Sequence, residues 1–343
     1  MKHVQLSELQ ANAKKALVIF PGALGDFICF LPALEKLARD GEIDLLAQAQ
    51  YADLLPATVK TRSLECYEIT RLFVAGAERD QRLRVFFGSY AFIVSWMGSS
   101  QPDFVKHLQA LSNGKLRIFP FRPSRSRVHM VDYYLSCLGE RSPREIFPGI
   151  PLRSDALVWS RRFWRQSGLE KKRVLVLAPG SGAKEKNWPI QFYRVVAEWW
   201  EKRFGGKVLI VSGPVEEERG EIGGLWASAL VVHGLDLAQV AALLFRCDLY
   251  LGNDSGVTHL AAALGVETVA LFGPTDVTQW APRGGRVTVI SQNAECSPCM
   301  DSIMKACPHR KCLTAFRPGD VIRMLEKVLE RSPGLDEAGR QSP

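Results

Sequence analysis

The segment 251–282, LGNDSGVTHLAAALGVETVALFGPTDVTQWAP, constrains the fold more than any other part of the chain. Its pattern predicts a strand, a tight polar turn, a helix, a second strand and a Gly-Pro turn. The turn and the start of the helix read Asp254, Ser255, Gly256, Val257, Thr258 and His259. Free N–H groups and the positive end of the dipole at such a helix start favour a phosphate. The segment therefore indicates a nucleotide- or diphosphate-binding α/β enzyme, or an ordinary strand–turn–helix with Asp254 or Ser255 as N-cap.

The rest of the chain repeats this alternation of strands and helices. Apolar runs predict strands at 16–20, 43–47, 63–69, 92–96, 116–119, 173–178, 207–212, 229–233, 249–251, 268–272 and 286–291. Helical periodicity predicts helices at 27–39, 130–138, 191–204, 237–245, 258–264 and 318–330. Pro32 lies inside the first helix and is expected to kink it or to delay its regular part.

Two runs of such units, each about 150 residues long, predict an α/β chain of two doubly wound, Rossmann-like domains. We expect the domains at 1–160 and 161–331, with the seam in the proline- and arginine-rich stretch 143–167, and a disordered tail at 332–343. Ligands of open parallel sheets bind at the carboxyl ends of strands, which predicts a cleft between the domains. The loops expected to line it follow Phe20, Ala178, Ser212, Leu251 and Phe272, and all carry Gly or Pro.

The 343 residues carry a net charge of +8, which suits nucleic acid, an anionic membrane surface or a phosphorylated substrate. Basic residues concentrate at 117–127 and 161–172, although a solvated basic face is the simpler interpretation. No zinc-finger spacing or RNP-type strand accompanies them, so we expect no nucleic-acid partner. No signal peptide and no run of about 18 apolar residues is visible, so we expect a cytoplasmic protein that can contact the membrane through its basic face.

The first loop, PGALGD at 21–26, places Asp26 at the entrance of a helix. Glycines permit tight turning there. Asp26 is either an N-cap or a general base that takes a proton from an attacking hydroxyl. The loop is neither a Walker A motif nor a clean GxGxxG.

The second loop, PGSGAKEKNWP at 179–189, combines glycines, a hydroxyl and lysines. Ser181 and the N–H groups around it can wrap a phosphate, and Lys184 or Lys186 can neutralise a leaving diphosphate. A flexible loop with solvated lysines, ended by a packed Trp188 and by Pro189 at the start of the next helix, is the alternative.

Four of the eight cysteines form a C-x2-C-x7-C-x4-C pattern, namely Cys296, Cys299, Cys307 and Cys312. The spacing is similar to zinc or iron–sulfur sites. The alternatives are a reduced cysteine-rich loop, which we favour, a structural metal site, and disulfides, which a cytoplasmic compartment disfavours.

Three blocks together carry a family resemblance: GALGDFICFLPAL at 22–34, PGSGAKEKNWP at 179–189 and DSGVTHLAAALGVETVALFGPTD at 254–276. In this order they resemble glycosyltransferase family nine, the bacterial heptosyltransferases of lipopolysaccharide core assembly. The resemblance implies a GT-B fold, in which the N-terminal domain takes the acceptor and the C-terminal domain takes the nucleotide sugar. It also implies metal-independent, inverting transfer without a cofactor, with ADP-heptose as the donor substrate.

The resemblance assigns roles to individual residues. It implies that Asp26 is the general base, that Lys186 lies near the donor phosphates and that Asp254 lies near the donor sugar. The remaining residues that it places at the donor are Ser181, Gly182, Ser255, Gly256, Val257 and His259. We expect Gly25, Arg122, Arg125 and Arg127 to bind a phosphorylated lipid A–core acceptor.

Two rival functions stay open beside this interpretation. One is a family member with another nucleotide sugar, because the sequence does not decide between ADP, GDP and UDP. The other is an inactive nucleotide- or lipid-binding module, against which the joint presence of Asp26, Lys186 and Asp254 argues. We further expect a monomer that contacts the inner membrane peripherally.

Overall fold

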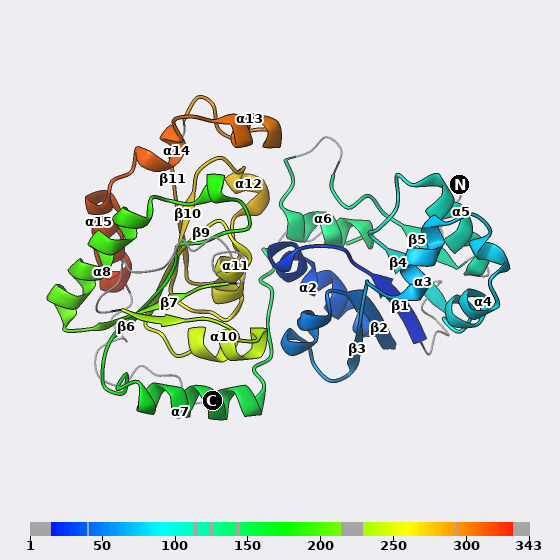
Figure 1. Ribbon diagram of the computed structural model, residues 1–343, viewed down its shortest axis with the longest axis horizontal. Helices are drawn as coiled ribbons and strands as arrows, with labels where there is room; N and C mark the ends of the chain where they lie inside the picture. Colours follow the sequence, from blue (N-terminus) through cyan, green and yellow to red (C-terminus); the bar gives the residue numbers. More distant parts are fainter. Residues whose placement is uncertain are drawn as a thin grey trace. The chain divides into compact units, whose positions relative to one another are not determined.

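The computed structural model describes residues 15–39, 41–112, 115–123, 127–140, 145–213, 229–292 and 294–331. The chain divides into two compact α/β units, an N-terminal unit, Met1–Ile146, and a C-terminal unit, Phe147–Pro343 (Figure 1). The division falls earlier than the boundary expected at 160/161, because helix α7 (Ser154–Gln166) packs on α10 (Leu237–Leu244) of the C-terminal unit. The tail expected at 332–343 lies outside the described residues.

The N-terminal unit is built on a parallel sheet of five strands in the order β3-β2-β1-β4-β5. The strands are β1 (Lys15–Ile19), β2 (Glu42–Ala47), β3 (Val59–Ser63), β4 (Phe92–Ser95) and β5 (Leu116–Ile118). β1 is central and pairs with β2 on one side and β4 on the other. Its four residues after Lys15 are buried, which explains the continuous apolar run.

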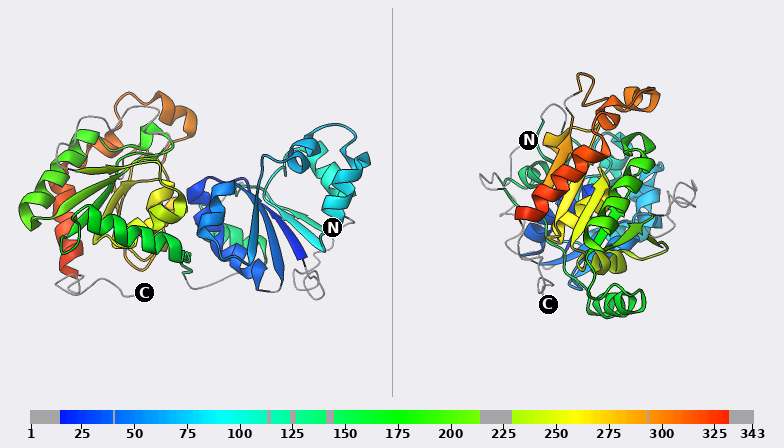
Figure 2. Two further views of the ribbon diagram at one scale, coloured as in Figure 1. Left: turned by 60° about the horizontal axis from the view of Figure 1, so that its bottom comes forward. Right: turned by 90° about the vertical axis from the view of Figure 1, so that its left-hand side faces the viewer.

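Helices cover both faces of this sheet (Figure 2). α2 (Leu24–Ala38) packs against α6 (Met130–Cys137). Leu17, Ile19 and Ile93 form a core with buried residues of α4 (Gln81–Gly88) and α5 (Pro102–Leu111). α2 begins three residues earlier than predicted and continues through Pro32 as one helix. Pro32 therefore does not delay the helix.

One strand prediction in this unit is wrong. The strand expected at 63–69 is replaced by β3, which ends at Ser63, and by the short helix α3 (Tyr67–Thr70). Ile69 and Leu72 are buried in the same core as α4 and α5, so their apolar character reflects packing of a helical segment.

α4 and α5 were not predicted. The side chain of Asp80 caps α4 by accepting hydrogen bonds from the N–H groups of Arg82 and Leu83.

The C-terminal unit contains a parallel sheet of six strands in the order β11-β10-β9-β6-β7-β8. The strands are β6 (Val174–Ala178), β7 (Lys207–Val211), β8 (Leu230–Val232), β9 (Leu249–Asn253), β10 (Thr268–Phe272) and β11 (Val287–Ser291). All six were predicted within two residues at each end. β9 extends to Asn253, so that it ends directly before Asp254.

One face of this sheet is covered by α8 (Ile190–Phe204) and α15 (Pro318–Arg331), which lie side by side in green and red in Figure 2. Their apolar residues share a core with Leu175, Leu177 and Leu251. α11 (Gly256–Ala263) contacts β9 and β10, and α10 contacts both α7 and α11. Three shorter helices complete the unit: α12 (Val277–Trp280), α13 (Asp301–Ala306) and α14 (Lys311–Thr314).

The division between the units falls inside the seam expected at 143–167, but the second half of this stretch is a regular helix rather than weakly periodic. Ala156, Ser160 and Trp164 recur at four-residue intervals and are all buried, which makes α7 an amphipathic helix. The surrounding arginines obscured this stripe. Ala156 packs against Ala238 and Ala242 of α10.

In both sheets the strand order reverses beside the first strand of the unit. β6 has β7 on one side and β9 on the other, and β1 has β2 and β4. Ligands of open α/β sheets bind at such switch points, outside the carboxyl ends of the strands. The loops that follow β1, β6 and β9 carry Asp26, Lys186 and Asp254. The fold thus brings Lys186 and Asp254 to neighbouring strand ends.

Candidate functional site

Asp26 lies in the first turn of α2 and is 8% exposed. Ala23 occupies the N-cap position, so the interpretation of Asp26 as an N-cap is wrong. Gly22 lets Phe20 and Asp26 approach the backbone closely, because a Cβ at position 22 would lie 2.4 Å from the Phe20 ring and 2.6 Å from the Asp26 Cβ. The Tyr51 hydroxyl donates to the Gly22 carbonyl at 3.0 Å. The hydrogen bond from Tyr51 and the close packing by Phe20 and Asp26 therefore hold the loop in place at Gly22.

Arg122 forms an ion pair with Asp26 through Nη1 and Oδ1. The same Nη1 lies 3.3 Å from the Tyr134 hydroxyl, and the guanidinium stacks over the Phe121 ring at 4.1 Å. Burial, and secondly the charge of Asp26, raises the pKa of both Tyr51 and Tyr134. Both tyrosines therefore stay protonated around the carboxylate.

Two of the residues that we expected to bind the acceptor, Gly25 and Arg122, lie at Asp26. Arg122 is ion-paired with Asp26, and its side chain keeps 41% of its surface exposed. Gly25 lies beside Asp26 in α2, and Arg127 is exposed. Arg125 lies outside the described residues.

In the C-terminal unit, Lys186 and Asp254 form an ion pair in which Nζ lies 2.8 Å from Oδ2. Lys186 ends the short 3-10 helix η4 (Lys184–Lys186) and is half-buried, whereas Lys184 is exposed. Asp254 is buried directly after β9. Of the two lysines that the sequence left open, Lys186 is the one that pairs with Asp254.

Asn253 ties the loop after β6 to the end of β9. It is fully buried, and its Oδ1 accepts from the Trp188 N–H at 2.9 Å and from the Tyr193 hydroxyl at 3.0 Å. Its Nδ2 donates to the Pro179 carbonyl at 2.6 Å. Sequence reasoning missed Asn253. Its position at the strand end directly before Asp254 was the signal that could have identified it.

Asn253→Ala is expected to lower the free energy of unfolding by roughly 3 kcal/mol, because three buried partners lose their hydrogen bond at once. Urea denaturation followed by tryptophan fluorescence measures this loss. Asn187→Ala is the control, since the Asn187 side chain accepts one half-buried hydrogen bond from Ser181. A loss of stability no larger than that of the control would contradict the anchoring role of Asn253.

α11 begins at Gly256, so the N–H groups of Gly256 and Val257 have no carbonyl partner within the helix. Ser255 occupies the N-cap position, but its side chain caps no N–H group and lies 3.1 Å from the Thr258 hydroxyl instead. Ser255 is therefore the N-cap residue by position, as the alternative expected, but its side chain forms no capping hydrogen bond. His259 is buried one turn into the helix. This helix start has the local features of an anion site.

The Ser181 hydroxyl is engaged within its own loop. It contacts the Ala183 carbonyl at 2.7 Å and donates to Asn187 Oδ1 at 2.6 Å. Gly182 is exposed, and a Cβ at this position would meet no atom within 4 Å. Ser181 therefore shapes the loop, and sterics do not require glycine at 182.

The four clustered cysteines, Cys296, Cys299, Cys307 and Cys312, all have free thiols. Burial, followed by the charges of the three other thiols, raises the pKa of Cys312 to about 11. Within the described part of the chain, no three or more His, Cys, Asp or Glu side chains are already placed to hold a metal ion.

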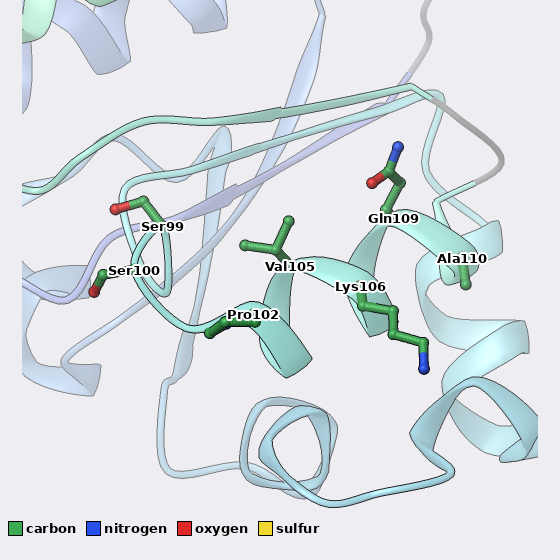
Figure 3. Close-up of a pocket in the computed structure, with 7 residues that line it drawn as sticks. All are labelled: Ser99, Ser100, Pro102, Val105, Lys106, Gln109 and Ala110. Atoms are coloured by element: carbon green, nitrogen blue, oxygen red, sulfur yellow. The ribbon is translucent and has the colours of Figure 1, made fainter.

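A cavity of about 650 Å³ lies along α5 in the N-terminal unit. Figure 3 shows Val105, Lys106 and Gln109 of α5 on its wall. None of the residues expected at the acceptor or donor lines it, so it is a separate surface feature.

No helix of the described residues is long and apolar enough to cross a membrane.

Comparison with known proteins finds a similarity to one family in the second half of the chain. The family model "Glycosyltransferase family 9 (heptosyltransferase)" matches residues 148–308. The chain is 40% identical over 89 residues to lipooligosaccharide heptosyltransferase 2 of Campylobacter jejuni, an alignment that covers 25% of this chain and 27% of that relative. The chain thus spans about a quarter of the length of this curated relative.

Solved structures extend the likeness to the whole fold. The family 9 glycosyl transferase of Veillonella parvula aligns with a TM-score of 0.73 at 21% identity, over 93% of this chain and 98% of that one. ADP-heptose LPS heptosyltransferase II of E. coli aligns with a TM-score of 0.70 at 18% identity, over 93% and 99%. The fold is the GT-B fold that the sequence blocks implied.

Proposed function

We propose that the protein transfers a heptose from ADP-heptose to a hydroxyl of the lipopolysaccharide inner core, because residues 148–308 match the model of glycosyltransferase family 9. The observation that carries the proposal is the Lys186–Asp254 pair beside the start of α11, at the switch point of the six-stranded sheet. A cation beside unpaired N–H groups suits a diphosphate.

In this proposal the C-terminal unit binds the donor. Lys186 Nζ moves from Asp254 to the diphosphate, where it neutralises the charge that grows as ADP leaves. The N–H groups of Gly256 and Val257 donate to the same phosphates. The Asp254 carboxylate, released from the lysine, accepts hydrogen bonds from hydroxyls of the sugar. In this proposal these groups stabilise the leaving diphosphate, and the role is not assigned to a catalytic metal ion.

The N-terminal unit supplies the base. Arg122 binds Oδ1 of Asp26, so Oδ2 is the oxygen that takes the proton of the acceptor hydroxyl. The acceptor oxygen then forms a bond to the anomeric carbon of the heptose. The bond from that carbon to the diphosphate oxygen breaks on the opposite face, so ADP leaves and the configuration inverts. Arg122 orients the carboxylate and presents an exposed cation to a phosphorylated acceptor.

Two further features belong to the same proposal. The exposed Arg122 and Arg127 suit the anionic surface in which a lipid-linked acceptor is embedded. We therefore propose that the protein works at the cytoplasmic face of the inner membrane, and we expect it to be a monomer.

Calorimetric titration with ADP, GDP, UDP and ADP-heptose tests the donor. Selective binding of ADP and ADP-heptose is expected, and Ser255→Trp should abolish it by filling the space before α11. Ser154→Trp, at the exposed start of α7, is the matched control and should bind normally. Preference for GDP or UDP would replace the donor, and binding of none of the four would favour an inactive module.

A further inference from the structure

The basic segment 161–172 is a sequence feature that the proposed reaction leaves without a role. Between positions 153 and 173 the chain carries seven arginine or lysine residues and two acidic ones, which give this stretch a net charge of +5, against +8 for the whole chain. Most of the stretch is helix α7, which lies at the edge of the C-terminal unit beside α10 (Figure 1). Positive charge is thus concentrated on and around one surface helix.

The buried stripe of α7 determines which of its side chains face outward. The stripe begins with Ala156, which packs against α10. Residues about half a turn away on the helix surface point away from α10. Arg161, Arg162 and Arg165 are exposed there, and Val158, one turn before them on the same side, keeps 53% of its surface exposed. These four residues form what we call the outer face of α7.

The two acidic residues of the stretch do not neutralise the outer face. Asp155 pairs with Arg153, which lies outside the helix, at 2.6 Å. Glu170 approaches Arg165 at 3.6 Å, but both side chains are largely exposed, so water screens this pair. In the part of the chain that the structure describes, the other two arginines of the outer face pair with no carboxylate. The outer face therefore keeps its positive charge.

Two aromatic rings border the outer face. Trp159 and Phe163 lie one turn apart and are partly exposed, and their rings stack with centroids 5.4 Å apart. Arg162 lies one turn from both Trp159 and Val158, so cationic and apolar groups alternate on the helix surface. Tryptophan and arginine each join an apolar body to a polar end, which suits the headgroup region of a bilayer. Because the two rings stack on each other, less ring surface is left to stack with nucleic-acid bases.

We propose that the outer face of α7 docks on a bilayer that contains anionic phospholipids. A helix with arginines beside tryptophan and phenylalanine lies in the plane of such an interface, and anionic headgroups attract its cations. Lys171 and Lys172, both exposed just after the helix, extend the cationic surface. The choice of a membrane as the partner rests on the proposed function, because a lipid-linked acceptor lies in a bilayer. The surface belongs to the C-terminal unit and is distinct from Arg122 and Arg127 of the N-terminal unit.

Vesicle flotation tests the surface on the full chain. The protein should bind vesicles of phosphatidylcholine mixed with phosphatidylglycerol and should not bind vesicles of phosphatidylcholine alone. Arg161→Gln, Arg162→Gln and Arg165→Gln combined should weaken binding to the anionic vesicles by about 100-fold, because each lost cation weakens the attraction to the headgroups. The buried stripe is unchanged in this variant and none of the three arginines belongs to the proposed donor site, so ADP-heptose should bind as before.

Lys202→Gln, Arg203→Gln and Lys207→Gln combined are the matched control, because they remove three exposed cations elsewhere in the same unit and should leave vesicle binding intact. Equal losses in the two triple variants would overturn the proposal, since docking would then depend on net charge alone. A wild-type protein that does not distinguish the two kinds of vesicle would also overturn it, as would one that binds a single-stranded oligonucleotide and no vesicles.

If the arginine variant fails to fold, the wild-type protein still decides the question. Anionic vesicles should protect Lys171 and Lys172 from acetylation and leave Lys202 and Lys207 reactive, whereas equal reactivity of all four would reject the surface. The donor is a separate matter. Docking on anionic vesicles by a protein that does not bind ADP-heptose would retain the surface while rejecting the proposed donor.

Discussion

Turnover should fall by about 10²–10⁴-fold in Asp26→Ala, while the affinity for ADP-heptose stays nearly unchanged. The expectation follows from position, because Asp26 belongs to the N-terminal unit and the proposed donor groups to the C-terminal unit. Loss of the base raises the barrier for deprotonating the acceptor hydroxyl and leaves the diphosphate contacts intact. Steady-state assays with a core acceptor measure turnover, and calorimetry with ADP-heptose measures the affinity for the donor.

Asp103→Ala is the matched control, because Asp103 is an exposed aspartate in the first turn of another helix of the same unit. It should leave turnover unchanged. Asp26→Asn separates charge from shape, since an amide keeps the contact volume but cannot take the proton. If Asp26→Ala or Asp26→Asn turned over at nearly the wild-type rate, Asp26 would not be the general base.

The parallel strands were predictable because the apolar pattern of each segment agrees with its burial in the sheet. Buried strands of a parallel sheet are apolar on both faces, so runs such as 16–20 and 268–272 can be recognised as strands from the sequence. The loops that follow them could also be placed, because a parallel sheet puts the functional loops at the carboxyl ends of its strands. This reasoning put Asp26, Asp254 and the two candidate lysines, Lys184 and Lys186, at strand ends, and the family resemblance chose Lys186 between them.

The errors have a different physical origin. The segment around Ile69 is helical because its apolar residues pack under α4 and α5, which local propensity does not reveal. α7 was hidden because its buried stripe is narrow and most of its other residues are charged or polar. Side-chain partners separated by many residues were equally out of reach. The pairing of Arg122 with Asp26 spans 96 residues, and the hydrogen bond from Trp188 to Asn253 spans 65.

Lys186→Ala is expected to weaken ADP binding and to lower turnover by about 10²–10³-fold. Two effects add in this variant. The diphosphate loses its cation, and the buried Asp254 carboxylate loses the partner that lies 2.8 Å away. An uncompensated anion beside the phosphate site repels the donor, so both the ground state and the transition state suffer.

The two effects can be separated by a double-mutant cycle. Asp254→Asn in the Lys186→Ala background removes the repulsion and should recover part of the ADP affinity, but it should not restore turnover, because the cation is still missing. Lys184→Ala is the control, since this exposed lysine lies in the same 3-10 helix and its contact with Arg310 uses the backbone carbonyl rather than the ammonium group. Equal losses in Lys184→Ala and Lys186→Ala would mean that the loop contributes only diffuse positive charge. A loss confined to Lys186, with partial recovery through Asp254→Asn, would locate the diphosphate at the pair beside the start of α11.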